Sequence, residues 1–89
     1  MENSKIITYD LCSDGKNYED LYKYLKSFPH WARITESTWF VSSEKSCVKI
    51  RDEIKSFTDS DDRIFVAVLT GEAAWSNCIC KSDYLKKYL

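Results

Sequence analysis

The chain has 89 residues, enough for one domain, and its formal net charge of −1 argues against a protein that coats nucleic acid through a broad basic face. No apolar run approaches the roughly 20 residues that span a bilayer, and the N-terminus lacks the apolar centre of a signal peptide. We therefore expect a cytoplasmic protein without a membrane partner. In that compartment the four cysteines are expected to be reduced thiols rather than a disulfide framework: Cys12, Cys47, Cys78 and Cys80.

Large aromatic side chains are abundant for a chain of this length, with 3 Trp, 6 Tyr and 4 Phe. Aromatic side chains bury a large area each and dominate both cores and interfaces. A small domain has room for only a modest core. Part of this apolar surface is therefore expected to close against a second copy of the chain, and two-fold dimers are the commonest closed assembly.

The first strand is predicted over residues 5–11, which are rich in β-branched and aromatic residues. Ile6 and Ile7 point to opposite faces, and apolar groups on both faces favour an interior strand. The strand reaches Asp10 near its end, and the loop 12–16 that follows contains an Asp-Gly turn signal. A strand that carries one acid into a turn is a common way to present a functional carboxylate.

The first helix is predicted over residues 18–28, with Asn17 as its N-cap and Pro29 ending it. Apolar residues recur there at spacings of three and four, which places them on one helix face. They are Tyr18, Leu21, Tyr22, Leu25 and Phe28.

A second strand is predicted over residues 32–42, after a turn at His30 and Trp31. A second helix follows over residues 44–57, with a plausible N-cap at Ser43. Its apolar stripe consists of Cys47, Ile50, Ile54 and Phe57.

An acidic loop over residues 58–62 precedes the third strand, 63–69, which is nearly all apolar and is therefore expected at the sheet centre. The tail 71–89 is expected to add a short strand around Cys78 and Cys80 and a short helix from Ser82. The whole is one α+β domain over 1–89, with its core in residues 5–70. Two helices cover one sheet face and leave the other face for a different contact.

Asp10 has two interpretations. It is either a metal ligand paired with its counterpart in a second copy and helped by Asp14, or it accepts backbone N–H bonds in the turn before Asn17. Arg33 lies near the polar start of the second strand, where it meets a phosphate or pairs with Glu36.

Other chemically suggestive groups favour structural roles. His30 is expected as a solvated turn residue. The two cysteines of the tail are too few for a structural zinc site, which needs about four ligands. The acidic loop lacks the glycine and distal glutamate of a calcium loop. Trp39 is expected to pack in a core or dimer interface rather than to stack on a base.

The strand–helix–strand–helix–strand order, opening on a strand that ends Tyr9-Asp10-Leu11, resembles the small ferredoxin-like family of CRISPR-associated Cas-two proteins and the related VapD-type ribonucleases. The matching blocks are residues 6–10, 36–41 and 62–66. The resemblance covers residues 5 to about 70 and is strongest for short Cas-two-like proteins that are not tied to a CRISPR locus.

The resemblance implies a ferredoxin-like antiparallel sheet with two helices on one face and a homodimer formed through the other. It also implies that Asp10 lies near the two-fold axis, where two copies can share a divalent metal. Some relatives are metal-dependent nucleases, whereas in others the dimer holds DNA beside an integrase without cutting it. Magnesium or manganese suits such an oxygen site.

Two functions therefore remain open. The first is a nucleic-acid-associated homodimer with metal-dependent endonuclease activity on RNA or DNA. In it Asp10 is the catalytic and metal-binding residue, and Lys16 and Arg33 bind nucleic acid. The alternative is a non-catalytic homodimer that binds another protein through its aromatic tail or its acidic loop.

Overall fold

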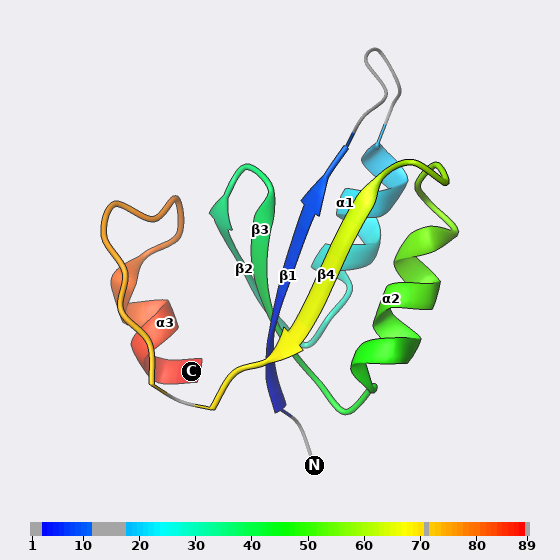
Figure 1. Cartoon of the computed structure of the whole chain (residues 1–89). Coiled ribbons are helices and arrows are strands. Elements are labelled where there is room, and N and C mark those ends of the chain that lie inside the picture. The colour runs from blue at the N-terminus through cyan, green and yellow to red at the C-terminus, as the bar shows by residue number, and fades with distance from the viewer. Residues whose placement is uncertain (1–2, 12–17, 71, 89) are drawn as a thin grey trace.

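A computed structural model describes residues 3–11, 18–70 and 72–88 of the chain (Figure 1). Four strands form its sheet: β1 (Asn3–Asp10), β2 (His30–Thr35), β3 (Thr38–Ser43) and β4 (Arg63–Val68). Three helices accompany them: α1 (Glu19–Lys26), α2 (Cys47–Lys55) and α3 (Ser82–Tyr88). The α+β class predicted from the sequence is confirmed.

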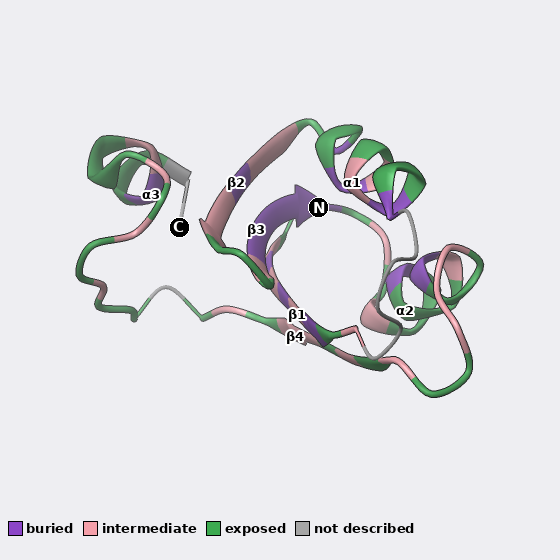
Figure 2. Cartoon of the chain, turned by 90° about the horizontal axis from the view of Figure 1, so that it is seen from above, coloured by how far each residue is buried: buried purple, intermediate pink, exposed green. Residues whose placement is uncertain are grey.

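The strands run antiparallel to their neighbours in the order β2-β3-β1-β4. Seen from above, α1 and α2 lie on one side of the sheet and α3 lies on the other (Figure 2). The predicted interior position of β1 is confirmed, since β1 pairs with both β3 and β4. The predicted pair of helices on one face is confirmed as well.

The main core lies between the sheet and the pair α1 and α2. Ile7 of β1 and Trp39 of β3 are fully buried in it, so the predicted packing role of Trp39 is confirmed. The helices contribute four more fully buried side chains: Leu21, Leu25, Ile50 and Ile54. Burial of each such aliphatic side chain stabilises the fold by about 1.5–3 kcal/mol relative to exposure.

The helix predicted over 18–28 is shorter at both ends. It begins at Glu19, and Tyr18 occupies the N-cap position without a side-chain capping bond. Acidic residues in the first turn and basic residues in the last turn complement the helix dipole instead. The predicted N-cap, Asn17, lies outside the described residues.

The single strand predicted over 32–42 is wrong, because the chain reverses at Glu36 and Ser37 and forms the hairpin β2–β3. Contacts from β2 itself and from β1 hold this turn. The Arg33 guanidinium donates to the Glu36 carbonyl at 2.7 Å through Nη2. The Tyr9 backbone N–H donates to the Ser37 carbonyl at 3.1 Å, and the Tyr9 hydroxyl donates to the Glu36 carbonyl at 3.2 Å.

The second helix begins at Cys47, three residues after the predicted start. Its N-cap is Ser46, whose hydroxyl accepts the Lys49 backbone N–H at 3.1 Å. Ser43, the predicted cap, instead accepts the Lys45 backbone N–H at 3.0 Å in the connection before the helix.

The central position predicted for the strand 63–69 is also wrong. β4 pairs with β1 alone and forms an edge of the described sheet. Ile64 and Val66 pack against the main core, whereas Phe65, which points to the other face, is 61% exposed. The apolar side chains of β4 therefore alternate between the main core and the opposite, exposed face of the sheet.

The tail partly covers the second sheet face. The predicted helix from Ser82 is confirmed as α3, and Leu85 packs with Ala32 of β2 and Phe40 of β3. No strand forms around Cys78 and Cys80, where the described chain bends instead. In the described part of the chain, no helix is long and apolar enough to cross a membrane.

Candidate functional site

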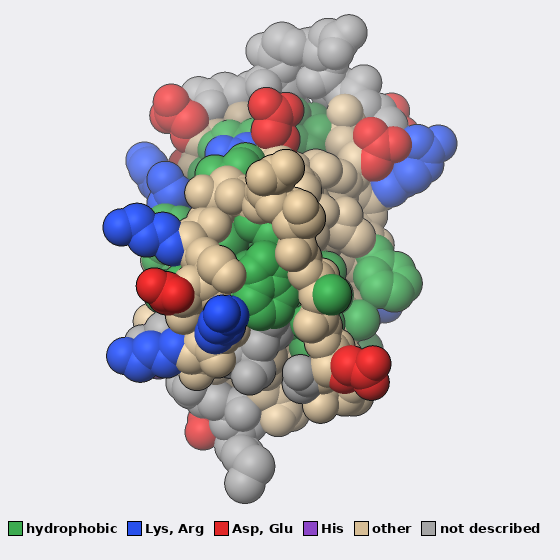
Figure 3. Space-filling model, turned by 90° about the vertical axis from the view of Figure 1, so that its left-hand side faces the viewer, with side chains coloured by type: hydrophobic (Ala, Val, Ile, Leu, Met, Phe, Trp, Pro, Cys, Tyr) green, Lys and Arg blue, Asp and Glu red, His purple; other side chains and the backbone are tan. Residues whose placement is uncertain are grey.

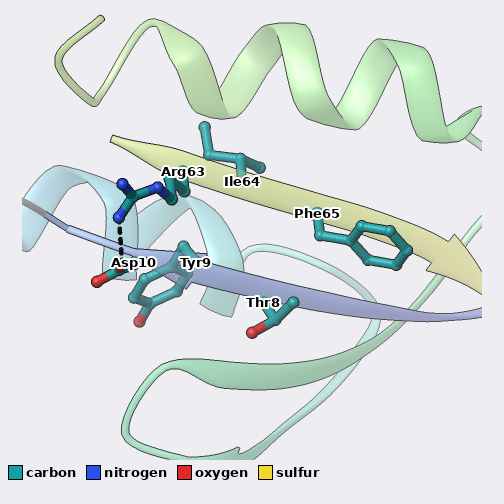
Figure 4. A pocket seen from close by; sticks show the side chains of 6 residues that line it. All are labelled: Thr8, Tyr9, Asp10, Arg63, Ile64 and Phe65. Carbon is teal, nitrogen blue, oxygen red and sulfur yellow. Dashed lines mark hydrogen bonds and ion pairs between the residues drawn. The ribbon is translucent and has the colours of Figure 1, made fainter. Parts of the chain in front are cut away.

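The candidate site lies at the C-terminal end of β1, where Asp10 pairs in register with Arg63, the first residue of β4. Arg63 Nη1 donates to Asp10 Oδ2 at 2.8 Å (Figure 4). The two side chains are 75% and 66% exposed, respectively. The site therefore presents a carboxylate and a guanidinium together at the surface.

An open hollow of about 180 Å³ adjoins this ion pair. Directly paired residues of antiparallel strands share a face, so Thr8 and Phe65 lie on the same face as Asp10 and Arg63. This is the sheet face opposite α1 and α2. Figure 4 shows the Phe65 ring and the Thr8 hydroxyl along the strands from the ion pair.

A second hollow, of about 280 Å³, lies between the end of β1 and the β2–β3 turn, and Asp10 borders it as well. It brings Asp10 and Arg33, two residues predicted from the sequence, to the border of one cavity. The remaining lining comes from Tyr9, Leu11, Tyr22, Glu36 and Ser37. Asp10 thus borders both hollows, one of which it shares with Arg63 and the other with Arg33 and Glu36.

Arg33 is engaged by aromatic rings and by the hairpin turn. Its guanidinium carbon lies 5.0 Å from the Tyr22 ring centroid and 5.2 Å from that of Trp39. The predicted pairing with Glu36 occurs through the backbone carbonyl of that residue, which accepts from both Arg33 Nε and Arg33 Nη2. These contacts orient Arg33 beside the second hollow.

Tyr9 anchors the strand end that carries Asp10. Its hydroxyl accepts a hydrogen bond from Trp39 Nε1 at 2.9 Å and donates to the Glu36 carbonyl. Burial is the main cause that raises the pKa of Tyr9, so the phenol stays neutral near pH 7 and keeps donating. Asp10 is therefore held on a rigid backbone although its own side chain is exposed.

One chain does not supply a complete metal site in the ranges that the structure describes. No group of three or more His, Cys, Asp or Glu residues comes together there. Asp10 offers carboxylate oxygens, which suit a hard cation, but other protein oxygens would have to come from outside these ranges or from another copy. Asp14 and Lys16, predicted to assist Asp10 and to bind nucleic acid, lie outside the described residues.

The structure places the remaining candidates in structural positions. His30 is not a turn residue: it opens β2, pairs with Ser42 and is half-buried. Asp62 organises the acidic loop, since its carboxylate accepts the Asp59 backbone N–H at 2.8 Å and the Tyr18 hydroxyl at 3.3 Å. This arrangement supports the predicted turn at the acidic loop.

Sequence reasoning missed Arg63 as a site residue. The sequence marks it only as the polar start of an apolar strand, 53 positions from Asp10. The strand register brings the two together, and that register depends on how the sheet packs against the helices.

A search of protein-family models and searches of curated proteins and of solved structures found no match to this chain.

Proposed function

We propose that this chain is a Cas-two-like, homodimeric protein associated with nucleic acid, and that it contacts phosphodiester groups at the end of β1. The observation that carries the proposal is the exposed ion pair between Asp10 and Arg63 beside an open hollow. The strand order and the two helices on one face are compatible with the ferredoxin-like arrangement that this resemblance implies.

The ion pair is suited to exchanging partners. Ion pairs between exposed side chains contribute only about 0–1 kcal/mol, so little free energy is lost when a ligand separates them. Arg63 would then donate to phosphate oxygens, for which its planar guanidinium is well shaped. Arg33, beside the second hollow, adds positive charge about the same rim.

Metal-dependent cleavage requires two copies in this proposal. Asp10 is one carboxylate per chain, and a two-fold axis near it would bring a second carboxylate to a shared magnesium or manganese ion. Such an ion would polarise the phosphodiester and supply activated water. The contribution of this chain is to hold the Asp10 backbone in place through Tyr9 and to offer Arg63 to the substrate.

The sheet face that carries Asp10 also carries an apolar strip formed by β1 and β4, which are neighbours in the sheet. The strip consists of Ile6, Phe65 and Ala67; Ile6 pairs in register with Ala67, and Phe65 pairs with Thr8. The tail packs on the β2–β3 half of this face and contacts Ala32 and Phe40 there. We assign the β1–β4 half to the homodimer contact, which would bring the two Asp10 residues toward each other.

The alternative is a non-catalytic homodimer that binds another protein. It is favoured by one observation: the Asp10 carboxylate is already ion-paired with Arg63. In that case Asp10 and Arg63 join the strands β1 and β4 and have no substrate.

The test incubates the full chain with labelled RNA and DNA in magnesium, in manganese and in a metal chelator. Asp10→Asn is compared with Asp52→Asn, which removes a similarly exposed carboxylate paired with Arg51 on α2. The nuclease proposal expects cleavage that needs metal, survives Asp52→Asn and is lost in Asp10→Asn.

Binding is measured separately from cleavage, over a range of salt concentrations. Phosphate contacts give an affinity that falls steeply with salt. Binding without cleavage would restrict the function to nucleic-acid association. Equal cleavage by both variants would overturn the role of Asp10, and an absence of binding and cleavage would favour the protein-interaction alternative.

A further inference from the structure

Cys78 and Cys80 lie together where the tail meets β2. Both thiols are half-buried, and both pack against the second apolar cluster, which contains Ala32, Phe40 and Leu85. The two cysteines are two residues apart in the chain and pack against the same cluster, so both side chains lie at one place on the sheet. The function proposed for the β1 end uses neither residue.

The backbone between the two thiols is bent. In an extended strand, residues two apart are separated by about 6.6 Å, which is near the upper limit of about 6.8 Å for disulfide-bonded Cα atoms. The chain bends at Ile79 and Cys80, and a bend shortens this separation. The two Cα atoms therefore lie within the range in which a disulfide can close.

The tertiary structure holds this bend in place. The Ile79 backbone N–H donates to the Ile34 carbonyl of β2 at 3.0 Å, so the residue between the cysteines is fixed to the sheet edge. Just before it, Asn77 adopts a positive φ of 56°, a conformation that asparagine tolerates better than most residues. Tyr84 of α3 secures the same edge by accepting the Trp31 backbone N–H at 2.9 Å.

Small thiol reagents can reach the pair. Cys80 lines an open hollow of about 270 Å³ between β2 and the tail, whose other walls include Trp31, Ile79 and Tyr84. Viewed from the side of α3, the molecule shows hydrophobic side chains at the centre of this face and lysine and arginine side chains along one border (Figure 3). A low-molecular-weight disulfide therefore has access to the Cys80 thiol.

We propose that Cys78 and Cys80 form a reversible intramolecular disulfide in the folded protein, with a low-molecular-weight disulfide such as oxidised glutathione as the oxidant. The thiolate of one cysteine attacks the oxidant and displaces one thiolate, which leaves a mixed disulfide on the protein. The second cysteine then attacks the protein sulfur and displaces the other thiolate. Two protein thiols are oxidised, one external disulfide is reduced to two thiols, and the two protons pass to those products.

The order of attack follows from access. Cys80 lines the open hollow, so the external disulfide meets this thiol first. We therefore assign the first attack to Cys80 and the displacement step to Cys78. Burial raises the pKa of Cys80, so the first step should quicken as the pH rises and the thiolate fraction grows. This order predicts that Cys78→Ser stops at a mixed disulfide on Cys80, whereas Cys80→Ser reacts more slowly.

The experiment uses the full chain carrying Cys12→Ser and Cys47→Ser, after circular dichroism has shown that it folds. It is equilibrated in reduced and oxidised glutathione, quenched by alkylation and analysed by peptide mass spectrometry. The expected product is a chain without intermolecular disulfides whose Cys78–Cys80 peptide has lost two hydrogens, resists alkylation and is restored by dithiothreitol. Glutathione adducts alone, intermolecular disulfides alone, or two alkylated thiols in excess oxidised glutathione would overturn the proposal.

The same titration in urea isolates the contribution of the fold. Since the bend and the Ile79–Ile34 hydrogen bond exist only in the folded chain, the equilibrium constant for ring closure should fall roughly tenfold on unfolding. An equal constant in urea would show that sequence spacing alone produces the disulfide, and the claim that the fold prepares the pair would then be wrong.

Discussion

The Arg63 guanidinium meets the Asp10 carboxylate at 2.8 Å across two neighbouring strands, although 53 residues separate them in the chain. Both side chains remain mostly exposed, so water screens their attraction. The pair therefore does little to hold β1 and β4 together. Its main physical consequence is to display opposite charges beside one hollow at the sheet rim.

Arg63→Gln should weaken nucleic-acid binding without unfolding the protein. Removal of one phosphate contact should reduce the slope of log affinity against log salt by about 1. The free energy of unfolding should change by less than about 1 kcal/mol, because the lost ion pair is exposed. Fluorescence anisotropy with a labelled oligonucleotide and urea denaturation measure the two effects.

Arg51→Gln is the matched control for that variant, since Arg51 is an exposed arginine that pairs with Asp52 at 2.9 Å on α2. It removes the same charge from α2, which lies on the other side of the sheet from the face that carries Arg63 (Figure 2). The same loss of affinity in both variants would contradict a specific role for Arg63 and would point to a general effect of net charge.

Phe65→Asp should dissociate the proposed homodimer. Phe65 is 61% exposed on the β1–β4 half of the second face, so its substitution costs the single chain little core packing. A charge buried without a partner at an interface is strongly unfavourable. Analytical ultracentrifugation over a range of concentrations should show a dimer for the original chain and a monomer for the variant.

Val48→Asp provides the comparison, because Val48 is similarly exposed, at 57%, on the helix side of the molecule. Its self-association should match that of the original chain. A dimer that survives Phe65→Asp but dissociates in Val48→Asp would place the contact on α2, and a monomeric original chain would remove the homodimer from the proposal.

Protonation of Glu53 should destabilise the fold in acid. Hydrogen bonds from Lys45 Nζ at 2.7 Å and from the Tyr24 hydroxyl at 2.6 Å lower the pKa of Glu53 below its ordinary value of 4.5. The folded state therefore binds this proton less tightly than the unfolded state. The resulting stability is fully present above about pH 4.5 and is lost as the pH falls through the lowered pKa of the folded state.

At alkaline pH, stability changes in the opposite direction, because the pKa of Tyr24 is raised rather than lowered. Burial first, and then Glu53, raise the pKa of Tyr24 above its ordinary value of 10.0. The folded state holds the phenolic proton more tightly, so this stability is present below about pH 10 and is lost as the pH rises further. Urea denaturation across pH should show that Glu53→Gln flattens the acid side and Tyr24→Phe the alkaline side. Unchanged profiles would contradict this triad.

Leu85→Ala should release α3 from the sheet. Leu85 is 1% exposed, and truncation of a buried leucine usually costs about 2–5 kcal/mol. A seven-residue helix is unstable alone, so α3 should unfold locally while the main core persists. Hydrogen exchange should show lost protection in 82–88 and retained protection at Ile7.

Lys86→Ala tests whether this effect is specific, because Lys86 is exposed on the same helix. Its exchange rates should remain within the range of the original chain. Retained protection of α3 in Leu85→Ala would show that the hydrogen bonds from the edge of β2 and the rest of the tail suffice to dock it.

The β2–β3 hairpin shows where prediction from the sequence failed. Its turn, Glu36 and Ser37, contains no Gly, Pro, Asn or Asp, and serine marks a turn more weakly than these residues do. The reversal is stabilised by Arg33, which precedes the turn in β2, and by Tyr9 of β1, and both bind the turn carbonyls. The contact of Tyr9 with Glu36 joins residues that are 27 positions apart, so the local sequence pattern does not encode it.

The sequence by itself determined the features that arise from local periodicity. Spacings of three and four located α1 and α2, because an amphipathic helix must bury its apolar face. A run of β-branched and aromatic residues located β1. It also singled out Asp10 as an acid at a strand end. The exact helix starts differed, since a cap depends on the hydrogen bond that one side chain forms.

Only the tertiary structure decided which segments became neighbours. Strand order made β4 an edge, register joined Asp10 to Arg63, and the docked tail brought Cys78 and Cys80 to the border of β2. These relationships join residues that are far apart in the chain. They follow from the packing of whole faces against one another, which no local pattern encodes.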